Sequence, residues 1–147
     1  MTDENTLEKD KNHDGNCFHI TTLGVVFDTK TRKILIGRRE DDSFTKELTW
    51  SFPGGFPDPD IDLEKGLEIE IKKKTGLEVK NLGSVFSRIF KENKGFILIY
   101  YLCEVVGGEE KSGASFKELK WVNPDELEKY FTTSMDPRLM EYIMNLK

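Results

Sequence analysis

Hydrophobic residues follow two periods along this chain, and these periods predict where its strands and helices lie. Alternating apolar residues, or short continuous apolar runs, are typical of strands in a sheet that is covered on both faces. These patterns occupy residues 17–27, 33–39, 77–90, 96–106 and 118–122, with a hairpin turn at 91–95. The acidic, glycine-containing residues 107–113 are expected to form a flexible loop. Asp136 and Pro137 provide a cap and a first-turn proline for a final helix that is expected to end at Leu146.

Residues 62–76 carry the pattern of an amphipathic helix. Asp62 is a suitable N-cap and Gly76 a common residue just past a helix end, so the helix is expected between them. At 100° per residue, Leu63, Leu67 and Ile71 fall within about 80° of one another and are expected to face the core. The expected solvated side holds Glu64, Lys65, Glu68 and Lys72, and the sector beside the core stripe holds Gly66, Glu70, Lys73 and Lys74. Because that last sector meets a neighbouring loop, it is the expected place for chemistry.

The segment before this helix breaks regular structure. Residues 50–52 are typical of an apolar strand end, and Pro53, Gly54 and Gly55 let the backbone come close to another group. The prolines at 57 and 59 keep the acidic loop that follows extended. A glycine-rich turn is therefore expected beside the charged face of the helix.

This stretch, residues 50–77, resembles the Nudix box, G-x5-E-x7-R-E-U-x-E-E-x-G-U with U aliphatic, preceded by the family's W-x-x-P-G-G lead-in. Gly55, Glu70, Ile71, Gly76 and Leu77 fall in register with the box. The resemblance implies an α+β Nudix fold, in which a mixed β-sheet is sandwiched between α-helices. It implies one Nudix domain over residues 17–147, and the charged, aperiodic residues 1–16 are expected to be a mobile polar tail.

The departures from the box concern its charged residues. The family's E-E pair, which holds divalent metal in its hydrolases, falls on Lys73 and Lys74. The first box glutamate falls on Ile61 and the box arginine on Ile69, so an ion pair becomes an apolar contact. Glu70 alone is kept among the box acids, and the resemblance implies that it is the catalytic residue and metal ligand.

These substitutions disfavour a metal site. Two ammonium groups in place of two carboxylates change the local charge by about four units. Magnesium needs hard oxygen ligands, so Glu70 alone is not expected to hold it tightly. Acids outside the box that could still complete a site are Asp58, Asp60, Asp62, Glu92, Glu109 and Glu110. Mg²⁺ or Mn²⁺ is therefore expected only if the protein is a hydrolase, and otherwise no cofactor is expected.

Other residues are candidates for contact with phosphate or base. Arg38 and Arg39 resemble the basic residues that the family often places after this strand to meet a phosphate, although a solvated strand end explains them equally well. The Gly54–Gly55 backbone is expected to approach phosphates. Residues 40–49 form a polar loop long enough to shape one wall of a pocket. For Tyr100 and Tyr101, core packing is favoured over stacking on a base.

Composition excludes several other classes of protein. A net charge of −5 and a pI of about 5.2 give no reason to expect nucleic acid or an anionic membrane as a partner. No apolar run approaches the length of a membrane span, and no G-x-S-x-G, P-loop or Cys/His cluster is present. Cys17 and Cys103 lie in separate apolar runs, which predicts buried reduced thiols rather than a disulfide and suits the cytoplasm.

Taken together, these patterns favour a protein that binds a nucleotide or another small molecule carrying a diphosphate. In this hypothesis Lys73 and Lys74 replace the charge of the metal, Arg38 or Arg39 assists, and hydrolysis is impaired or absent. An active hydrolase of nucleoside diphosphate derivatives, using Glu70 and acids outside the box, is the first alternative. A protein-interaction module with a vestigial pocket is the second.

Overall fold

The expected strand patterns form one mixed sheet. The computed structural model describes residues 17–39 and 49–146, so the expected tail at 1–16 and nearly all of the expected loop at 40–49 lie outside the described residues. The strands are β1 (His19–Asp28), β2 (Lys33–Arg39), β3 (Trp50–Ser51), β4 (Gly54–Gly55), β5 (Leu77–Ile89), β6 (Phe96–Gly108) and β7 (Phe116–Val122). They are arranged in the order β3-β2-β1-β6-β5, with β4 paired to β1 and β7 paired to β2. Only the central β1–β6 pair is parallel within this sheet of described residues.

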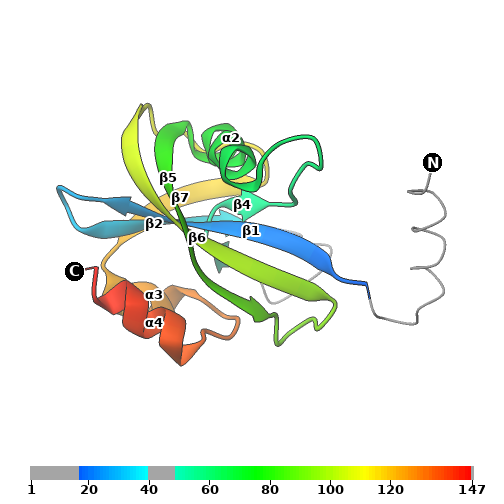
Figure 1. Cartoon of the computed structure of the whole chain (residues 1–147). Coiled ribbons are helices and arrows are strands. Elements are labelled where there is room, and N and C mark those ends of the chain that lie inside the picture. Colours follow the sequence, from blue (N-terminus) through cyan, green and yellow to red (C-terminus); the bar gives the residue numbers. More distant parts are fainter. Residues whose placement is uncertain (1–16, 40–48, 147) are drawn as a thin grey trace.

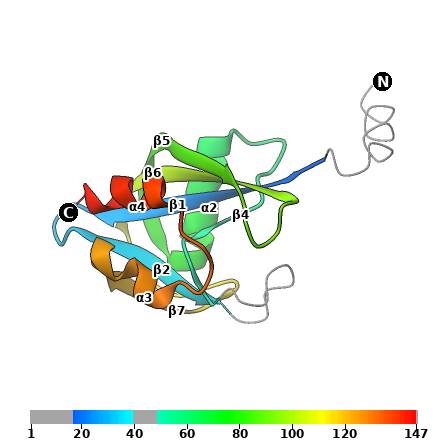
Figure 2. The ribbon, with the colours of Figure 1, turned by 90° about the horizontal axis from the view of Figure 1, so that it is seen from below.

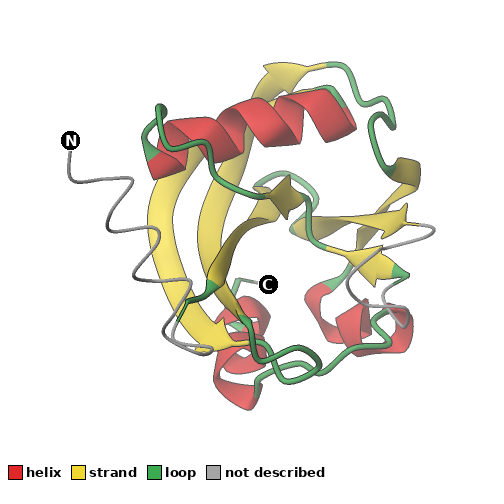
Figure 3. Ribbon diagram, turned by 90° about the vertical axis from the view of Figure 1, so that its right-hand side faces the viewer, coloured by secondary structure: helices red, strands yellow, loops and turns green. Residues whose placement is uncertain are grey.

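Helices cover both faces of the sheet (Figures 1 and 3). The helix α2 (Leu63–Thr75) lies on one face. On the other face lie the short helix η1 (Pro124–Glu126), α3 (Leu127–Tyr130) and α4 (Pro137–Met144), which Figure 2 shows in front of the strands. The predicted fold class, α+β with a mixed sheet between helices, is confirmed. Among the described residues, no helix is both long and apolar enough to cross a membrane.

The alternation of buried side chains explains why the central strands are continuously apolar. Val26 and Leu35 pack in a cluster with Leu67 and Ile71 of α2. Their neighbours Val25, Ile34 and Ile36 pack in the other cluster, with Leu127, Leu139 and Ile143 of the opposite helices. Successive residues of a strand point to opposite faces, so a sheet with two cores needs apolar residues at every position.

The ends of α2 agree with the sequence prediction. The Asp62 carboxylate accepts a hydrogen bond from the Glu64 amide at 3.3 Å. Gly76 has a left-handed backbone with φ of 76°, and its N–H donates to the Lys72 carbonyl at 2.9 Å. This conformation favours glycine because it strains residues that carry a Cβ. Both helix boundaries are therefore encoded locally.

Two predictions about the faces of α2 were wrong. Leu63 is 40% exposed, because the first turn of the helix lies over the irregular middle of the edge strand β5. Glu68 is not on a solvated side, since its carboxylate accepts a hydrogen bond from the Asn81 amide at 2.9 Å. The buried stripe consists of Leu67, Ile71 and Thr75, so the core contact is made by the last three turns.

Two other details also differ from the prediction. Cys17 is exposed, because the first strand begins at His19. Gly107 and Gly108 are part of β6, where they pair with Glu78 and Leu77, and do not belong to a loop. Cys103 is buried as predicted, burial raises the pKa of its thiol to about 12, and neither cysteine forms a disulfide.

Gly54 is expected to be essential for the pairing of β4 with β1. A Cβ at this position would overlap the backbone carbonyl of Thr22. A Gly54→Ala variant should therefore lower the free energy of unfolding by roughly 2–3 kcal/mol, since the backbone must move to relieve the overlap.

Chemical denaturation of both proteins measures this effect, and Gly66→Ala is a matched control. Gly66 lies inside α2, and a Cβ there would approach no atom closer than 3.7 Å. This control should stabilise the protein by about 0.5–1 kcal/mol through helix propensity. Equal stability of the Gly54→Ala variant and the unmodified protein would contradict the role assigned to Gly54.

Candidate functional site

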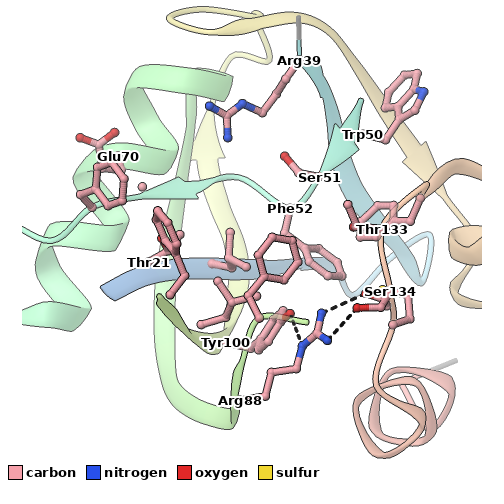
Figure 4. Close-up of a pocket in the computed structure, with 18 of the residues that line it drawn as sticks. Thr21, Arg39, Trp50, Ser51, Phe52, Glu70, Arg88, Tyr100, Thr133 and Ser134 are labelled. Carbon is pink, nitrogen blue, oxygen red and sulfur yellow. Dashed lines mark hydrogen bonds between the residues drawn. The ribbon is translucent and has the colours of Figure 1, made fainter. Parts of the chain in front are cut away.

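A cavity of about 420 Å³ opens between the sheet, the glycine-rich segment and the loop that follows α3. Its apolar walls include Phe52, Phe90, Phe96, Leu98, Tyr100 and Phe131. Polar groups lie on two sides of this apolar part. Figure 4 shows Arg39 and Glu70 on one side, and Arg88 with Ser134 on the other. The volume lies within the range of roughly 300–1,000 Å³ that is common for small-molecule sites.

Lys74 and Glu70 form the central contact of the first polar side. They lie one helical turn apart on α2, and the Lys74 ammonium is 3.9 Å from Glu70 Oε2. The ammonium also donates a hydrogen bond to the backbone carbonyl of Gly54. The Lys74 side chain is only 14% exposed. Burial lowers the pKa of Lys74 below its ordinary value of 10.5; Glu70 opposes this shift, whereas the charges of Arg39 and Lys73 add to it.

Lys73 and Lys74, for which the sequence predicted the same role, have different surroundings in the structure. Lys74 lines the cavity, whereas Lys73 does not. The Lys73 side chain is 65% exposed, and its ammonium lies 3.7 Å from Glu70 Oε1 on the outer side of the helix. The rotation of 100° per residue along a helix accounts for this difference. A role for Lys73 in binding stays a prediction, and any such role would be at a distance from the cavity wall.

The paired arginines and paired glycines are separated in a similar way. Arg39 lines the cavity, while Arg38 forms an ion pair with Glu118 of β7 at 3.1 Å. Gly55 lines the cavity, and a Cβ there would lie 3.3 Å from the Lys74 ammonium. Gly54 instead packs against β1 and presents its carbonyl oxygen to Lys74. Of the predicted site residues, the structure thus places Arg39, Gly55, Glu70 and Lys74 at the cavity wall.

These residues do not fit a divalent cation. The oxygens that could ligate one, the Glu70 carboxylate and the Gly54 carbonyl, already surround the Lys74 ammonium. Residues 17–39 and 49–146 contain no group of three or more His, Cys, Asp or Glu residues placed to hold a metal. Two of the acids proposed to complete a site have other partners. Glu92 accepts hydrogen bonds from Ser134, and Glu110 accepts one from the Trp121 indole at 2.6 Å.

The sequence did not reveal the second polar side of the cavity. Arg88 donates to the Tyr100 hydroxyl at 3.2 Å, to Ser134 Oγ at 3.1 Å and to the Ser134 carbonyl at 2.9 Å. Arg88 and Ser134 are 46 residues apart, so no local pattern joins them. Ser51 was also missed. Its hydroxyl oxygen is buried at the cavity wall and has no hydrogen-bond partner within the described part of the chain.

The fold and the box helix with its glycine-rich lead-in define a protein of the Nudix class. A model of the NUDIX domain family matches residues 18–142. The chain therefore belongs to the Nudix family.

Individual relatives agree with this assignment. The chain is 33% identical over 103 residues to an ADP-ribose pyrophosphatase of Methanocaldococcus jannaschii, covering 68% of this chain and 60% of that protein. It thus spans less than two thirds of that relative's length. It is 27% identical over 124 residues to a MutT-like protein of Streptomyces ambofaciens, covering 83% and 75%. The crystal structure of a MutT protein from Methanosarcina mazei Go1 superposes with a TM-score of 0.67 at 19% identity, covering 88% of this chain and 93% of that one.

Proposed function

We propose that the protein binds a nucleotide or another small molecule with a diphosphate, and that it does so without efficient metal-dependent hydrolysis. One observation carries the proposal: the Lys74 ammonium is held between the Glu70 carboxylate and the Gly54 carbonyl. The Lys74 ammonium thus contacts the oxygens that a magnesium ion would need as ligands. Lys74 can neutralise a phosphate as the metal does, but it cannot activate water by coordinating it.

The charges around Lys74 support a phosphate as the group bound there. Among the described residues of the cavity wall, Arg39 and Lys74 face one carboxylate, that of Glu70, so positive charge is in excess there. Arginine can bind phosphate oxygens with two parallel N–H groups. The hydroxyl of Ser51 and the backbone at Gly55 are further groups at the same wall. A diphosphate supplies several acceptor oxygens that such a set of donors can share.

The apolar part of the cavity supports a ligand with a ring beyond the diphosphate. Phe52 packs edge-on against Tyr100 and Phe131, with ring centres 6.0 and 5.0 Å apart. Phe56 lines the cavity and is 52% exposed, so it adds aromatic surface to the apolar part. A nucleotide combines these two chemistries in one molecule.

Active hydrolysis is the second candidate, and two observations favour it. Glu70, the kept box acid, lies at the cavity wall. The relative from M. jannaschii carries the name ADP-ribose pyrophosphatase. This activity would need Lys74 to leave its oxygens so that a metal could replace it, together with ligands from outside the box.

The cytoplasm is the proposed compartment. The supporting observation is that Cys103 is a buried thiol and that Cys17 is not joined to it. Reduced cysteines are usual in that compartment.

Isothermal titration calorimetry in EDTA tests the proposal. The probes are ADP-ribose, ADP, IDP, CDP and UDP, and the tightest-binding of them is called the reference diphosphate below. We expect the reference diphosphate to bind in EDTA with an affinity that Mg²⁺ changes by less than about threefold, and to weaken with salt because charges are screened. Binding that requires Mg²⁺ would contradict the proposal.

Turnover of the same probes with Mg²⁺ or Mn²⁺ distinguishes the two candidates. Release of product should be far slower than the roughly 1 per second that is ordinary for enzymes. Ordinary turnover that disappears in EDTA and in a Glu70→Gln variant would establish the hydrolase instead.

A further inference from the structure

Arg88 is fixed at the side of the cavity that lies opposite Glu70 and Arg39 (Figure 4). Its guanidinium donates to Tyr100, whose ring is buried, and to two oxygens of Ser134. Ser134 is itself held by Glu92, which accepts from the Ser134 amide at 2.5 Å and from its hydroxyl at 2.8 Å. The guanidinium also lies 5.7 Å from the centre of the Phe90 ring. A side chain restrained by so many contacts loses little freedom when a ligand binds.

The charge of Arg88 is balanced by the protein. Burial acts to raise the pKa of the Glu92 carboxyl. The hydrogen bonds from Ser134 and the charge of Arg88 act in the opposite direction, and the pKa is lowered below its ordinary value. Glu92 is therefore an anion close to Arg88 at neutral pH. At the Lys74 side, by contrast, the lining residues that the structure describes include two cations, Arg39 and Lys74, and one carboxylate, that of Glu70. The ligand's anionic group is thus favoured at Lys74, and an uncharged acceptor at Arg88.

Arg88 has donors to offer such an acceptor. The contacts recorded within the described residues use three of the five N–H groups that a guanidinium carries. Arginine has no acceptor atom, so it pairs with a carbonyl oxygen and not with an amino group. The surroundings are aromatic, since Phe52, Phe90 and Tyr100 line the same part of the cavity. A flat ring between such walls can direct one edge at the guanidinium.

We propose that Arg88 is a specificity-determining residue that recognises a ring carbonyl of the ligand. The ligand class is then a nucleotide whose base carries oxygen where adenine and cytosine carry an amino group, such as hypoxanthine at C6 or uracil at C4. Its diphosphate extends to Lys74 and Arg39. This inference rests on the proposed binding function, which fixes where the phosphates lie.

Two matched pairs of ligands test the inference by calorimetry in EDTA. IDP and ADP differ at one oxo or amino group of a purine, and UDP and CDP differ in the same way in a pyrimidine. We expect the oxo member to bind about tenfold more tightly in whichever pair binds better, because the position that faces Arg88 then carries an acceptor oxygen, whereas in the other member it carries an amino group that cannot accept. Arg88→Gln, whose amide both donates and accepts, should reduce this ratio to within about twofold.

Controls separate the inference from effects on folding and from the proposed function. Arg138→Gln removes the same charge from a side chain that is 76% exposed and does not line the cavity, and it should leave the ratio unchanged. Arg88→Lys keeps charge and a donor and should keep most of the preference. Because a ratio of affinities does not depend on the folded fraction, a destabilised variant still gives an answer.

Two results would overturn the inference. One is that ADP and CDP bind as tightly as IDP and UDP, and the other is that the Arg88→Gln ratio equals that of the unmodified protein. Either result, with inorganic pyrophosphate still bound in EDTA, would leave the proposed diphosphate function standing. If inosine and uridine instead bind as tightly as their diphosphates, the role of Lys74 fails while the carbonyl site at Arg88 stands.

Discussion

A Lys74→Glu variant should lose affinity for the reference diphosphate in EDTA by a factor on the order of 100 or more. A hydrogen bond that involves a charged group contributes roughly 1.5–3 kcal/mol, and the variant also places a second anion beside the phosphates. The new carboxylate would join the Glu70 carboxylate and the Gly54 carbonyl, which now surround the ammonium. These three groups supply oxygen ligands of the kind that Mg²⁺ prefers, so added Mg²⁺ should restore part of the binding.

Lys72→Glu is the matched control for this experiment. It makes the same change of charge on the same helix, but the Lys72 side chain is 52% exposed and lies 3.6 Å from Glu78, away from the cavity. Calorimetry of both variants should show an effect of less than about threefold for Lys72→Glu, as expected of a screened surface charge. Equal losses in the two variants would mean that Lys74 acts only through the net charge of the helix. Restored turnover in Lys74→Glu with Mg²⁺ is a further observation, which the proposal does not require.

The parts of the site that the sequence predicted are those with local signals. Asp62 and Gly76 define the helix by capping chemistry, which involves only near neighbours along the chain. Helical periodicity then places Glu70 and Lys74 on one side, and the structure brings their charged groups to 3.9 Å. The fold itself followed from the resemblance of residues 50–77 to a known motif and from strand patterns that imply two covered faces.

Adjacent residues of the same type could not be distinguished in this way. Lys73 and Lys74 differ by one step of the helix, and whether that step leaves or enters the cavity depends on how far the helix is rotated over the sheet. Arg38 forms an ion pair with Glu118 of β7 and Arg39 lines the cavity, and the pairing of β2 with β7 is irregular between them. Which lysine and which arginine line the cavity is therefore determined by tertiary packing, and sequence periodicity does not describe that packing.

Contacts between distant segments were also outside the reach of local patterns. Ser134 follows α3, whereas Arg88 and Glu92 belong to β5 and the turn after it. Their hydrogen bonds form only because the loop after α3 returns to the end of β5. Leu63 shows the same limit, because its apolar side chain lies on the core-facing stripe of the helix but beyond the well-covered part of the sheet.

The affinity for the reference diphosphate should fall as pH rises through the lowered pKa of Lys74. Burial is the main cause of that lowering, so the ammonium loses its proton at a lower pH than an exposed lysine. The neutral amine no longer attracts phosphate. The stability of the unliganded protein should depend on pH in the opposite direction, because Lys74 makes it more stable as pH rises. Between the lowered pKa and the ordinary value of 10.5, the unfolded chain binds more protons than the folded one, so stability from this group rises with pH.

Calorimetry from neutral to alkaline pH, paired with denaturant unfolding at each pH, measures both trends. Lys74→Met has no proton to lose, so its affinity should be weak and nearly constant over the range in which the unmodified protein weakens. Its stability should also lack the rise with pH that Lys74 contributes. Lys72→Met should keep both trends, because the exposed Lys72 lies outside the cavity. If the unmodified protein and the Lys74→Met variant weaken in parallel as pH rises, another group controls binding, and the diphosphate is not neutralised by Lys74.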